Sequence, residues 1–156
     1  MRLRVIAVGT RMSAWVNAAW NDYARRLRGA NAFELLELPV ARRHGAGDGQ
    51  RAAQLEAARI LAALEPRECV VALDERGRSL TTLQLGAWLE ERRADSQRVS
   101  FVIGGPDGLD ATVGERAQLR WSLSALTFPH ALVRVLLAEQ LYRVSTLRAG
   151  HPYHRA

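Results

Sequence analysis

Hydrophobic and polar positions change their spacing repeatedly along this chain, and the changes predict strands and helices in turn. Short apolar runs typical of strands occupy residues 2–9, 32–39, 67–74, 98–105 and 120–124. Amphipathic stretches with helical spacing occupy residues 13–29, 50–65, 81–95, 110–119 and 129–147. Because strands and helices alternate with little room for hairpins, the pattern predicts an α/β domain with a mainly parallel sheet and helices on both faces.

Local signals mark the starts of two helices. Ser13 precedes the first amphipathic stretch and is a residue type that caps helices. Thr81 and Gln84 have the spacing of a capping box, in which each side chain binds the other residue's backbone amide. We therefore expect the first and third helices to begin at these positions.

The last helix is the most apolar of the five. Pro129 lies in its first turn, and Glu139 precedes Arg143 at the spacing of a favourable ion pair. Its apolar residues cover more than one face, which predicts that it packs between its own sheet and a second subunit. Because this helix is so apolar, we expect the charge of Arg134 to be paired with another polar or charged group.

Composition narrows the class of protein. A chain of 156 residues suits one domain, residues 1–156, and its 48% hydrophobic and 24% charged residues are typical of a soluble globular protein. Cys69 lies among valines, which indicates a buried strand thiol rather than a disulfide or a nucleophile. The first apolar run is too short for a signal peptide, and no stretch reaches membrane-spanning length. We expect a cytoplasmic protein with no membrane partner.

The charge favours a nucleic-acid partner. The formal net charge is +6, and all 22 basic residues are arginine. Arginine binds phosphate in a planar geometry with two hydrogen bonds, so a basic arginine surface attracts nucleic-acid backbones. Codon bias explains the absence of lysine equally well.

Candidate ligand loops follow the predicted strands, because ligands of parallel sheets bind beyond the carboxyl ends of the strands. Gly104 and Gly105 lack a Cβ, so a ligand could approach the backbone, although a tight turn is the simpler interpretation. The apolar segment 122–130 precedes a helix and could hydrogen-bond a heterocycle such as adenine, or it could be a buried connection. Asp74 and Glu75 could bind a metal or act as a base, but a solvated loop is the commoner outcome.

The segment His151–Ala156, here called the tail, ends in residues with chemistry of their own. His151 and His154 have a spacing seen in zinc sites, but no further ligand completes a set, so we predict no metal. Tyr153, His154 and Arg155 suit an RNA contact through stacking, proton transfer and phosphate binding. A tail without a role is the alternative.

Four ordered segments together resemble a known family. They are LDERGRSLTT, FVIGGPDGL, SLSALTFPHALVRVLLAEQLYR and HPYHR. In this order and spacing they resemble the SPOUT-class RNA methyltransferases, most closely the bacterial enzymes that methylate N3 of a pseudouridine in helix 69 of 23S rRNA. The family's segment after the second strand is usually lysine-rich, whereas this chain has Arg42 and Arg43 there, so their contact with rRNA stays open.

The resemblance implies a homodimer with a C-terminal trefoil knot that binds S-adenosyl-L-methionine and acts on 23S rRNA within the ribosome, without a metal. By motif, the implied cofactor contacts are Leu73, Gly104, Leu123, Ser124, Ala125, Leu126, Thr127 and Phe128. For catalysis, we expect His154 to transfer the acceptor's proton, Arg155 to steady phosphate or the developing anion, and Tyr153 to orient the base. A ribosome-binding module without catalysis, and a flavodoxin-like or nucleotide-using metabolic enzyme, are the alternatives.

Overall fold

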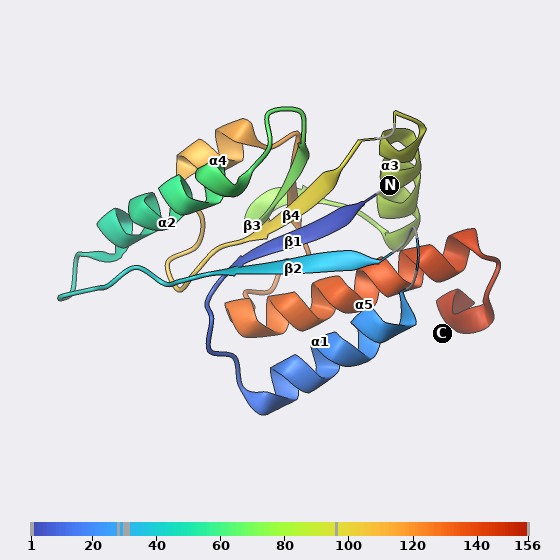
Figure 1. Cartoon of the computed structure of the whole chain (residues 1–156), viewed down its shortest axis with the longest axis horizontal. Helices are drawn as coiled ribbons and strands as arrows, with labels where there is room; N and C mark the ends of the chain where they lie inside the picture. Colours follow the sequence, from blue (N-terminus) through green and yellow to red (C-terminus); the bar gives the residue numbers. More distant parts are fainter. Residues whose placement is uncertain (1, 28, 30–31, 96, 156) are drawn as a thin grey trace.

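The computed structural model describes residues 2–27, 29, 32–95 and 97–155, without the side chains of His154 and Arg155. Five strands and five helices alternate and are followed by a short 3-10 helix (Figure 1). The elements are β1 (Leu3–Val8), α1 (Ala14–Arg26), β2 (Phe33–Leu38), α2 (Gly49–Ala63), β3 (Cys69–Ser79), α3 (Thr82–Ala94), β4 (Val99–Ile103), α4 (Ala111–Arg116), β5 (Leu119–Ser122), α5 (His130–Arg148) and η2 (Pro152–Arg155). The predicted order of elements is therefore confirmed.

The five strands form one parallel sheet in the order β2-β1-β4-β3-β5. Helices α2 and α4 lie above the sheet in Figure 1, and α1 and α5 lie below it. The sheet therefore has both faces covered, as the apolar strands predict. All strands run the same way, so their carboxyl ends share one edge of the sheet.

Two hydrophobic cores fill the space between these layers. Val5 and Ala7 of β1 face α1, α3 and α5, whereas Ile6 and Val8 face α2 and α4. This alternation follows from the strand's twofold side-chain period. Each fully buried aliphatic side chain contributes roughly 1.5–3 kcal/mol, so β1 is anchored from both sides.

The third strand is longer than predicted. Residues 74–79 continue it, so the expectation of a loop there is wrong, although most of them are exposed, as a solvated segment predicts. Trp121 of β5 pairs with Leu73 and again with Arg78, so β3 has a bulge in its register against β5 between these two residues. A Cβ on Gly77 would lie 2.6 Å from the carbonyl carbon of Arg120. Glycine is therefore required where the bulge touches the backbone of β5.

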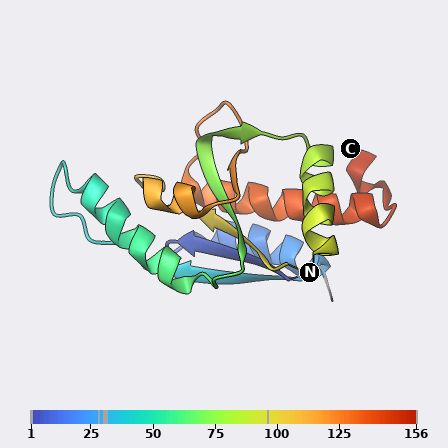
Figure 2. The same cartoon turned by 90° about the horizontal axis from the view of Figure 1, so that it is seen from above.

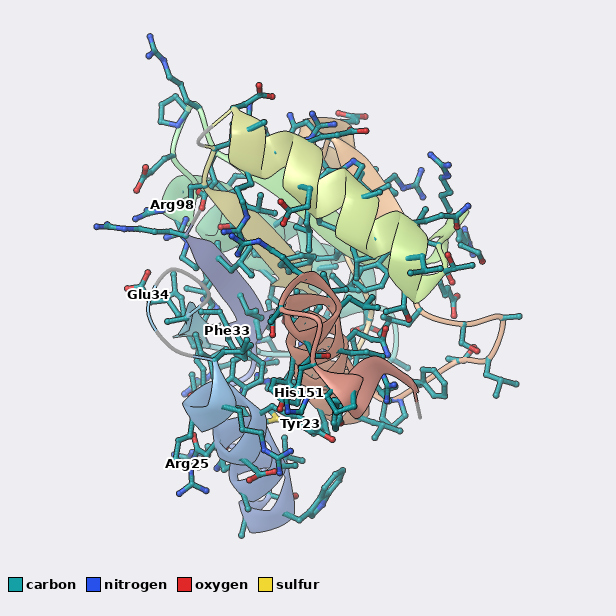
Figure 3. The ribbon with its side chains drawn as sticks, turned by 90° about the vertical axis from the view of Figure 1, so that its right-hand side faces the viewer. Tyr23, Arg25, Phe33, Glu34, Arg98 and His151 are labelled. Carbon is teal, nitrogen blue, oxygen red and sulfur yellow. The ribbon has the colours of Figure 1, made fainter. Side chains whose placement is uncertain are left out.

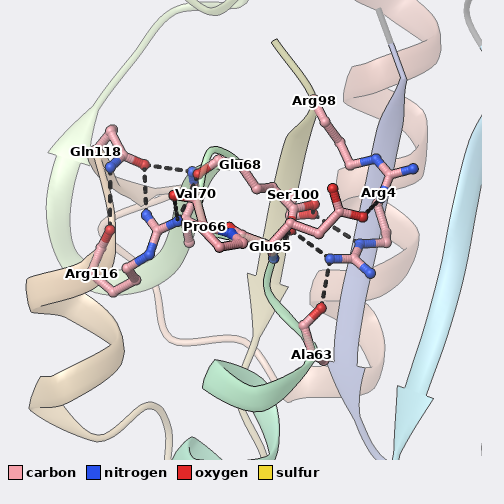
Figure 4. Close-up of polar contacts among 10 residues, drawn as sticks. All are labelled: Arg4, Ala63, Glu65, Pro66, Glu68, Val70, Arg98, Ser100, Arg116 and Gln118. Carbon is pink, nitrogen blue, oxygen red and sulfur yellow. Dashed lines mark hydrogen bonds and ion pairs between the residues drawn. The ribbon is translucent and has the colours of Figure 1, made fainter.

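A polar cluster closes the opposite, amino-terminal edge of the sheet (Figure 4). The Glu68 side chain is fully buried and accepts hydrogen bonds from Arg4 Nη2 at 2.6 Å and from Ser100 Oγ. Arg4 Nη2 also donates to the Ala63 carbonyl oxygen at 2.9 Å. These bonds join the end of α2 to the starts of three strands and satisfy a charge that would be costly to bury alone.

The capping signals have different outcomes. At α3 the capping box is confirmed, with Thr81 Oγ1 accepting from the Gln84 amide at 3.2 Å and Gln84 Oε1 accepting from the Thr81 amide at 2.9 Å. Ser13 does precede α1, but its side chain makes no cap hydrogen bond. The sequence therefore predicted where both helices begin, but the capping hydrogen bond forms only at α3.

Other local predictions are also settled by the fold. Cys69 is a buried free thiol, as expected. The ion pair between Glu139 and Arg143 forms, with Arg143 Nη2 2.7 Å from Glu139 Oε1. Among the described residues, no helix combines the length and the apolar character needed to cross a membrane.

Candidate functional site

The predicted cofactor residues meet at the carboxyl ends of three neighbouring strands. Ala72 of β3 pairs with Val102 of β4, so Leu73 and Gly104 follow at the same edge. Leu73 pairs in turn with Trp121 of β5, which leads into the segment 123–128. Register alone thus brings together segments that lie about twenty to thirty residues from the next along the chain.

The segment 123–128 is held by side-chain hydrogen bonds. Ser122 Oγ donates to the Ser124 carbonyl oxygen at 2.8 Å, and the Leu126 amide donates to Ser124 Oγ at 3.0 Å. Thr127 Oγ1 donates to Glu75 Oε2 at 3.1 Å, which ties the segment to the bulge of β3. The segment is therefore an ordered, irregular loop.

This loop has the chemistry that an adenine-type ring needs. Leu123 packs against the core, whereas Leu126 is 68% exposed and Ala125 and Thr127 are also exposed. Within the described part of the chain, residues 123–128 make no backbone-to-backbone hydrogen bond. Apart from the Ser124 carbonyl and the Leu126 amide, which bond to side chains, their amides and carbonyls therefore remain available beside apolar side chains, a combination suited to a flat heterocycle.

The glycine turn after β4 is shaped by its own backbone. A Cβ on Gly104 would lie 2.6 Å from the carbonyl carbon of Gly108. The Gly108 amide donates to the Gly105 carbonyl oxygen at 3.0 Å, and Gly108 has a φ of +77°. The tight turn, left open by the sequence, is thus present, and Gly104 is required for it whatever binds nearby.

A buried acid supports this turn, and it was not predicted from the sequence. Glu56 of α2 is 2% exposed, and its Oε1 accepts from Arg43 Nη1 and from the Ala41 amide, each at 3.0 Å. Arg43 Nε donates to Asp107 Oδ2 at 2.6 Å, which joins the loop 41–48 to the glycine turn. Hydrogen bonds to Glu56 and then Asp107 raise the pKa of Arg43. The sequence signal that could have revealed this site is the charged residue Glu56 among the apolar positions of α2.

Arg134 has the partner that the sequence required. Its guanidinium is 1% exposed and donates to Glu37 Oε2 at 2.5 Å and to the Gly9 carbonyl oxygen at 3.1 Å. These contacts fix the first turns of α5 to the ends of β1 and β2. Burial and then the charge of Arg134 lower the pKa of the nearby His130.

The acidic residues of the β3 bulge are engaged with other groups. Arg120 Nη2 lies 2.6 Å from Asp74 Oδ2, and the Arg76 amide donates to Asp74 Oδ1 at 2.9 Å. Burial acts to raise the pKa of Asp74, but these two partners outweigh it and the pKa is lowered. Among the described residues, no group of three or more histidine, cysteine or acidic side chains could hold a metal ion.

The tail lies at the other end of α5 from the candidate cofactor loop. Helix α5 has 19 residues, and at 1.5 Å per residue it is roughly 28 Å long. Figure 2 shows it running from the loops at the strand ends to the end that carries the C-terminus. Tyr153 packs there against α5, with its ring centroid 4.7 Å from that of Tyr142. The side chains of His154 and Arg155 lie outside the described part of the chain, so the expectations for them stay untested.

Comparison with known proteins identifies the family. A family model described as "Predicted SPOUT methyltransferase" matches residues 1–154. The chain belongs to the SPOUT methyltransferase family. The resemblance seen in the motifs is therefore confirmed, and the fold with its parallel sheet is that of a SPOUT protein.

Similar full-length relatives carry one name, "Ribosomal RNA large subunit methyltransferase H". The relative from Bordetella pertussis is 52% identical over 157 aligned residues, which cover 100% of each chain. The relatives from Thiobacillus denitrificans and Azotobacter vinelandii are 51% and 49% identical, and each covers 99% of this chain and 99% or more of its own. As a SPOUT methyltransferase, the protein requires a methyl donor, and the edge formed by β4, β3 and β5 is the candidate donor site.

Proposed function

We propose that this SPOUT protein is an S-adenosylmethionine-dependent methyltransferase of 23S rRNA that methylates N3 of a pseudouridine in helix 69, on the ribosome, in the cytoplasm. One observation carries the proposal. The residues implied for the cofactor converge at one sheet edge in a chain about half identical, over its whole length, to proteins named as large-subunit rRNA methyltransferases. The names support an rRNA substrate, and the ordered motifs support the nucleotide.

S-adenosylmethionine, when bound, supplies a methyl group activated by its sulfonium. We assign the backbone groups of 123–128 to its adenine ring, because they make no backbone-to-backbone hydrogen bond among the described residues. The exposed side chain of Leu126 would cover the ring. Leu73 and Gly104 would border the site at the strand ends, and no metal is needed for transfer to a ring nitrogen.

A homodimer explains how the tail could act at this site. One chain's own tail lies about the length of α5 from its own loop 123–128, roughly 28 Å, so a tail that serves the pocket must come from the partner. Leu132, Val135 and Leu136 are only half-buried in the single chain, and their burial would stabilise such a dimer. We therefore propose that two α5 helices pack antiparallel.

The residue roles follow from acid–base chemistry. The acceptor nitrogen must lose its proton before or during methyl transfer, and His154 is the residue type suited to accept it near neutral pH. Arg155 would stabilise the negative charge that develops on the uracil ring or bind an adjacent phosphate. Arg42 is exposed in the loop 41–48 and is positioned for a phosphate contact.

The trefoil knot is part of the same proposal. The bulge of β3 contacts two residues that follow α4 in the chain. Gly77 lies against the backbone of Arg120, and Glu75 bonds to Thr127. These contacts support passage of the segment 119–128 through the connection between β3 and β4. A knotted loop would hold the irregular backbone in place without further secondary structure.

The direct test is mass mapping of 23S rRNA after incubation of ribosomes from a strain lacking the protein with pure protein and S-adenosylmethionine. We expect one methyl group to appear on a pseudouridine of helix 69. Ribosome binding without methyl incorporation would instead indicate a binding module that lacks catalysis. Methylation elsewhere would contradict the proposed nucleotide.

The tail is tested by deleting His154–Ala156, which keeps Tyr153. We expect methylation to be lost while the affinity for S-adenosylmethionine, measured by calorimetry, is retained, because the deleted residues act on the acceptor. Unchanged turnover would discard their catalytic assignment.

The cofactor loop is tested with Leu126→Asp. This leucine is 68% exposed, so its replacement should cost little stability, yet it should weaken cofactor binding at least about tenfold by placing a charge against the ring. The control is Leu55→Asp, because Leu55 is 50% exposed on α2, across the sheet from α5. Equal affinities of both variants and wild type would contradict the assignment of this loop.

A further inference from the structure

All three tyrosines of the chain meet where the tail turns back against α5. Tyr153 of η2 lies ring to ring with Tyr142 of α5, and Tyr142 lies 6.0 Å from Tyr23 of α1 between ring centroids. Figure 3 views this end of the molecule, with Tyr23 and the exposed His151 labelled. Helix α1, more than a hundred residues earlier in the chain, thus meets α5 and the tail at these rings.

The ring of Tyr153 is held on several sides. Its hydroxyl donates to Glu139 Oε1 at 3.3 Å. The guanidinium carbon of Arg143 lies 4.9 Å from the ring centroid, and Arg143 Nη1 donates to the Tyr153 carbonyl oxygen at 3.4 Å. These contacts combine stacking, cation–π and polar interactions on one residue.

Glu139 is the centre of this cluster. Its carboxylate accepts from Gln140 Nε2 at 2.6 Å and from Arg143 Nε at 2.9 Å, as well as from the Tyr153 hydroxyl. Its side chain is only 17% exposed. An isolated i, i+4 ion pair would account for Arg143 alone, but not for an acid that also accepts a phenol from the tail.

The phenol keeps its proton at physiological pH. Burial first, and then the neighbouring Tyr23 and Glu139, raise the pKa of Tyr153 to about 12. A neutral phenol can keep donating to Glu139, whereas a phenolate would face a carboxylate. The side chain of Tyr153, which was expected to orient the base, is thus hydrogen-bonded within its own subunit.

We propose that Glu139 is a positioning residue that locks Tyr153, and so sets the direction in which His154 and Arg155 leave the helix. This inference rests on the proposed function, in which those two residues act on the acceptor. The anchor fixes the backbone directly before His154, so fewer tail residues must be ordered during the reaction. Tyr153 acts as the anchor point rather than as a contact to the base.

The test removes the acceptor of the Tyr153 hydroxyl. Glu139→Ala deletes the carboxylate that accepts from Tyr153, and Tyr142→Phe removes a hydroxyl from a tyrosine that contacts Tyr153 ring to ring, which makes it the control within the same cluster. We expect Glu139→Ala to lower kcat on ribosomes by roughly 10- to 100-fold, because small misplacements of reacting groups have effects of that size. KM for ribosomes, the affinity for S-adenosylmethionine and the melting temperature should change little.

A second pair separates positioning from loss of fold. Glu139→Gln keeps an acceptor for the phenol and should retain more activity than Glu139→Ala. Equal kcat for wild type and Glu139→Ala would overturn the inference.

Spectrophotometric titration of the tyrosines distinguishes this inference from the proposed function. Wild-type protein should contain one phenol that ionises late, and Tyr23→Phe and Glu139→Ala should each shift that ionisation to lower pH. If wild type does not methylate ribosomes, the proposed function fails, and the titration still tests the anchor. A late ionisation that neither variant shifts would reject the anchor itself.

Discussion

Replacing Arg134 with alanine should be among the most destabilising single changes in this protein. The guanidinium links α5 to the ends of two strands through Glu37 and the carbonyl of Gly9. It is also the largest of the fully buried side chains. The change therefore removes an ion pair, a hydrogen bond and buried volume at once.

The size of the effect follows from these three losses. The unpaired carbonyl of Gly9 costs about 2 kcal/mol. Two buried methylenes of the arginine stem contribute about 0.8 kcal/mol each. The ion pair is worth only about 1 kcal/mol, because the Glu37 side chain is 34% exposed and solvent screens it. The sum, about 4.6 kcal/mol, agrees with values for removing one partner of a buried pair.

Urea unfolding measures this loss. With a slope near 2 kcal/mol/M, the midpoint should fall by about 2 M at fixed protein concentration. Asp22→Ala is the control, because it breaks the exposed pair of Asp22 with Arg26, whose side chains are 49% and 44% exposed, and should cost about 0.5 kcal/mol or less. If Arg134→Ala unfolds no earlier than Asp22→Ala, the buried network is not what holds α5 to the sheet.

Three further predictions concern single sites. Gly77→Ala should lower the melting temperature and weaken cofactor binding, because its Cβ would lie 2.6 Å from the backbone of β5, whereas Gly45→Ala, with nothing within 4 Å, should change neither. The lowered pKa of His130, caused by burial and then by Arg134, means that the unfolded state binds more protons below about pH 6.5. Stability should therefore fall as the pH drops through that value, and His130→Asn should flatten this acid-side slope in urea midpoints measured across pH. Cys69 should react with a thiol reagent only after unfolding, since it is buried and burial raises its pKa; rapid reaction of the native protein would show that β3 opens.

The sequence by itself determined the features that depend on neighbouring residues. Hydrophobic spacing predicted each strand and helix, and the pair Thr81 and Gln84 predicted a capping box that forms as expected. The ordered motifs identified the SPOUT family, which the family match confirms. These properties are local or are carried by residue identity, so no knowledge of packing is needed to predict them.

Tertiary structure decided where each long-range partner lies. The charged segment 74–79 has the composition of a loop, yet it continues β3 because Trp121, more than forty residues later, pairs with Arg78. Arg134 required a partner, but its partner Glu37 is 97 residues away. Glu56 and Tyr153 likewise acquire their roles from segments distant in sequence. The free energy of such contacts depends on distance and burial, and both exist only once the chain has folded.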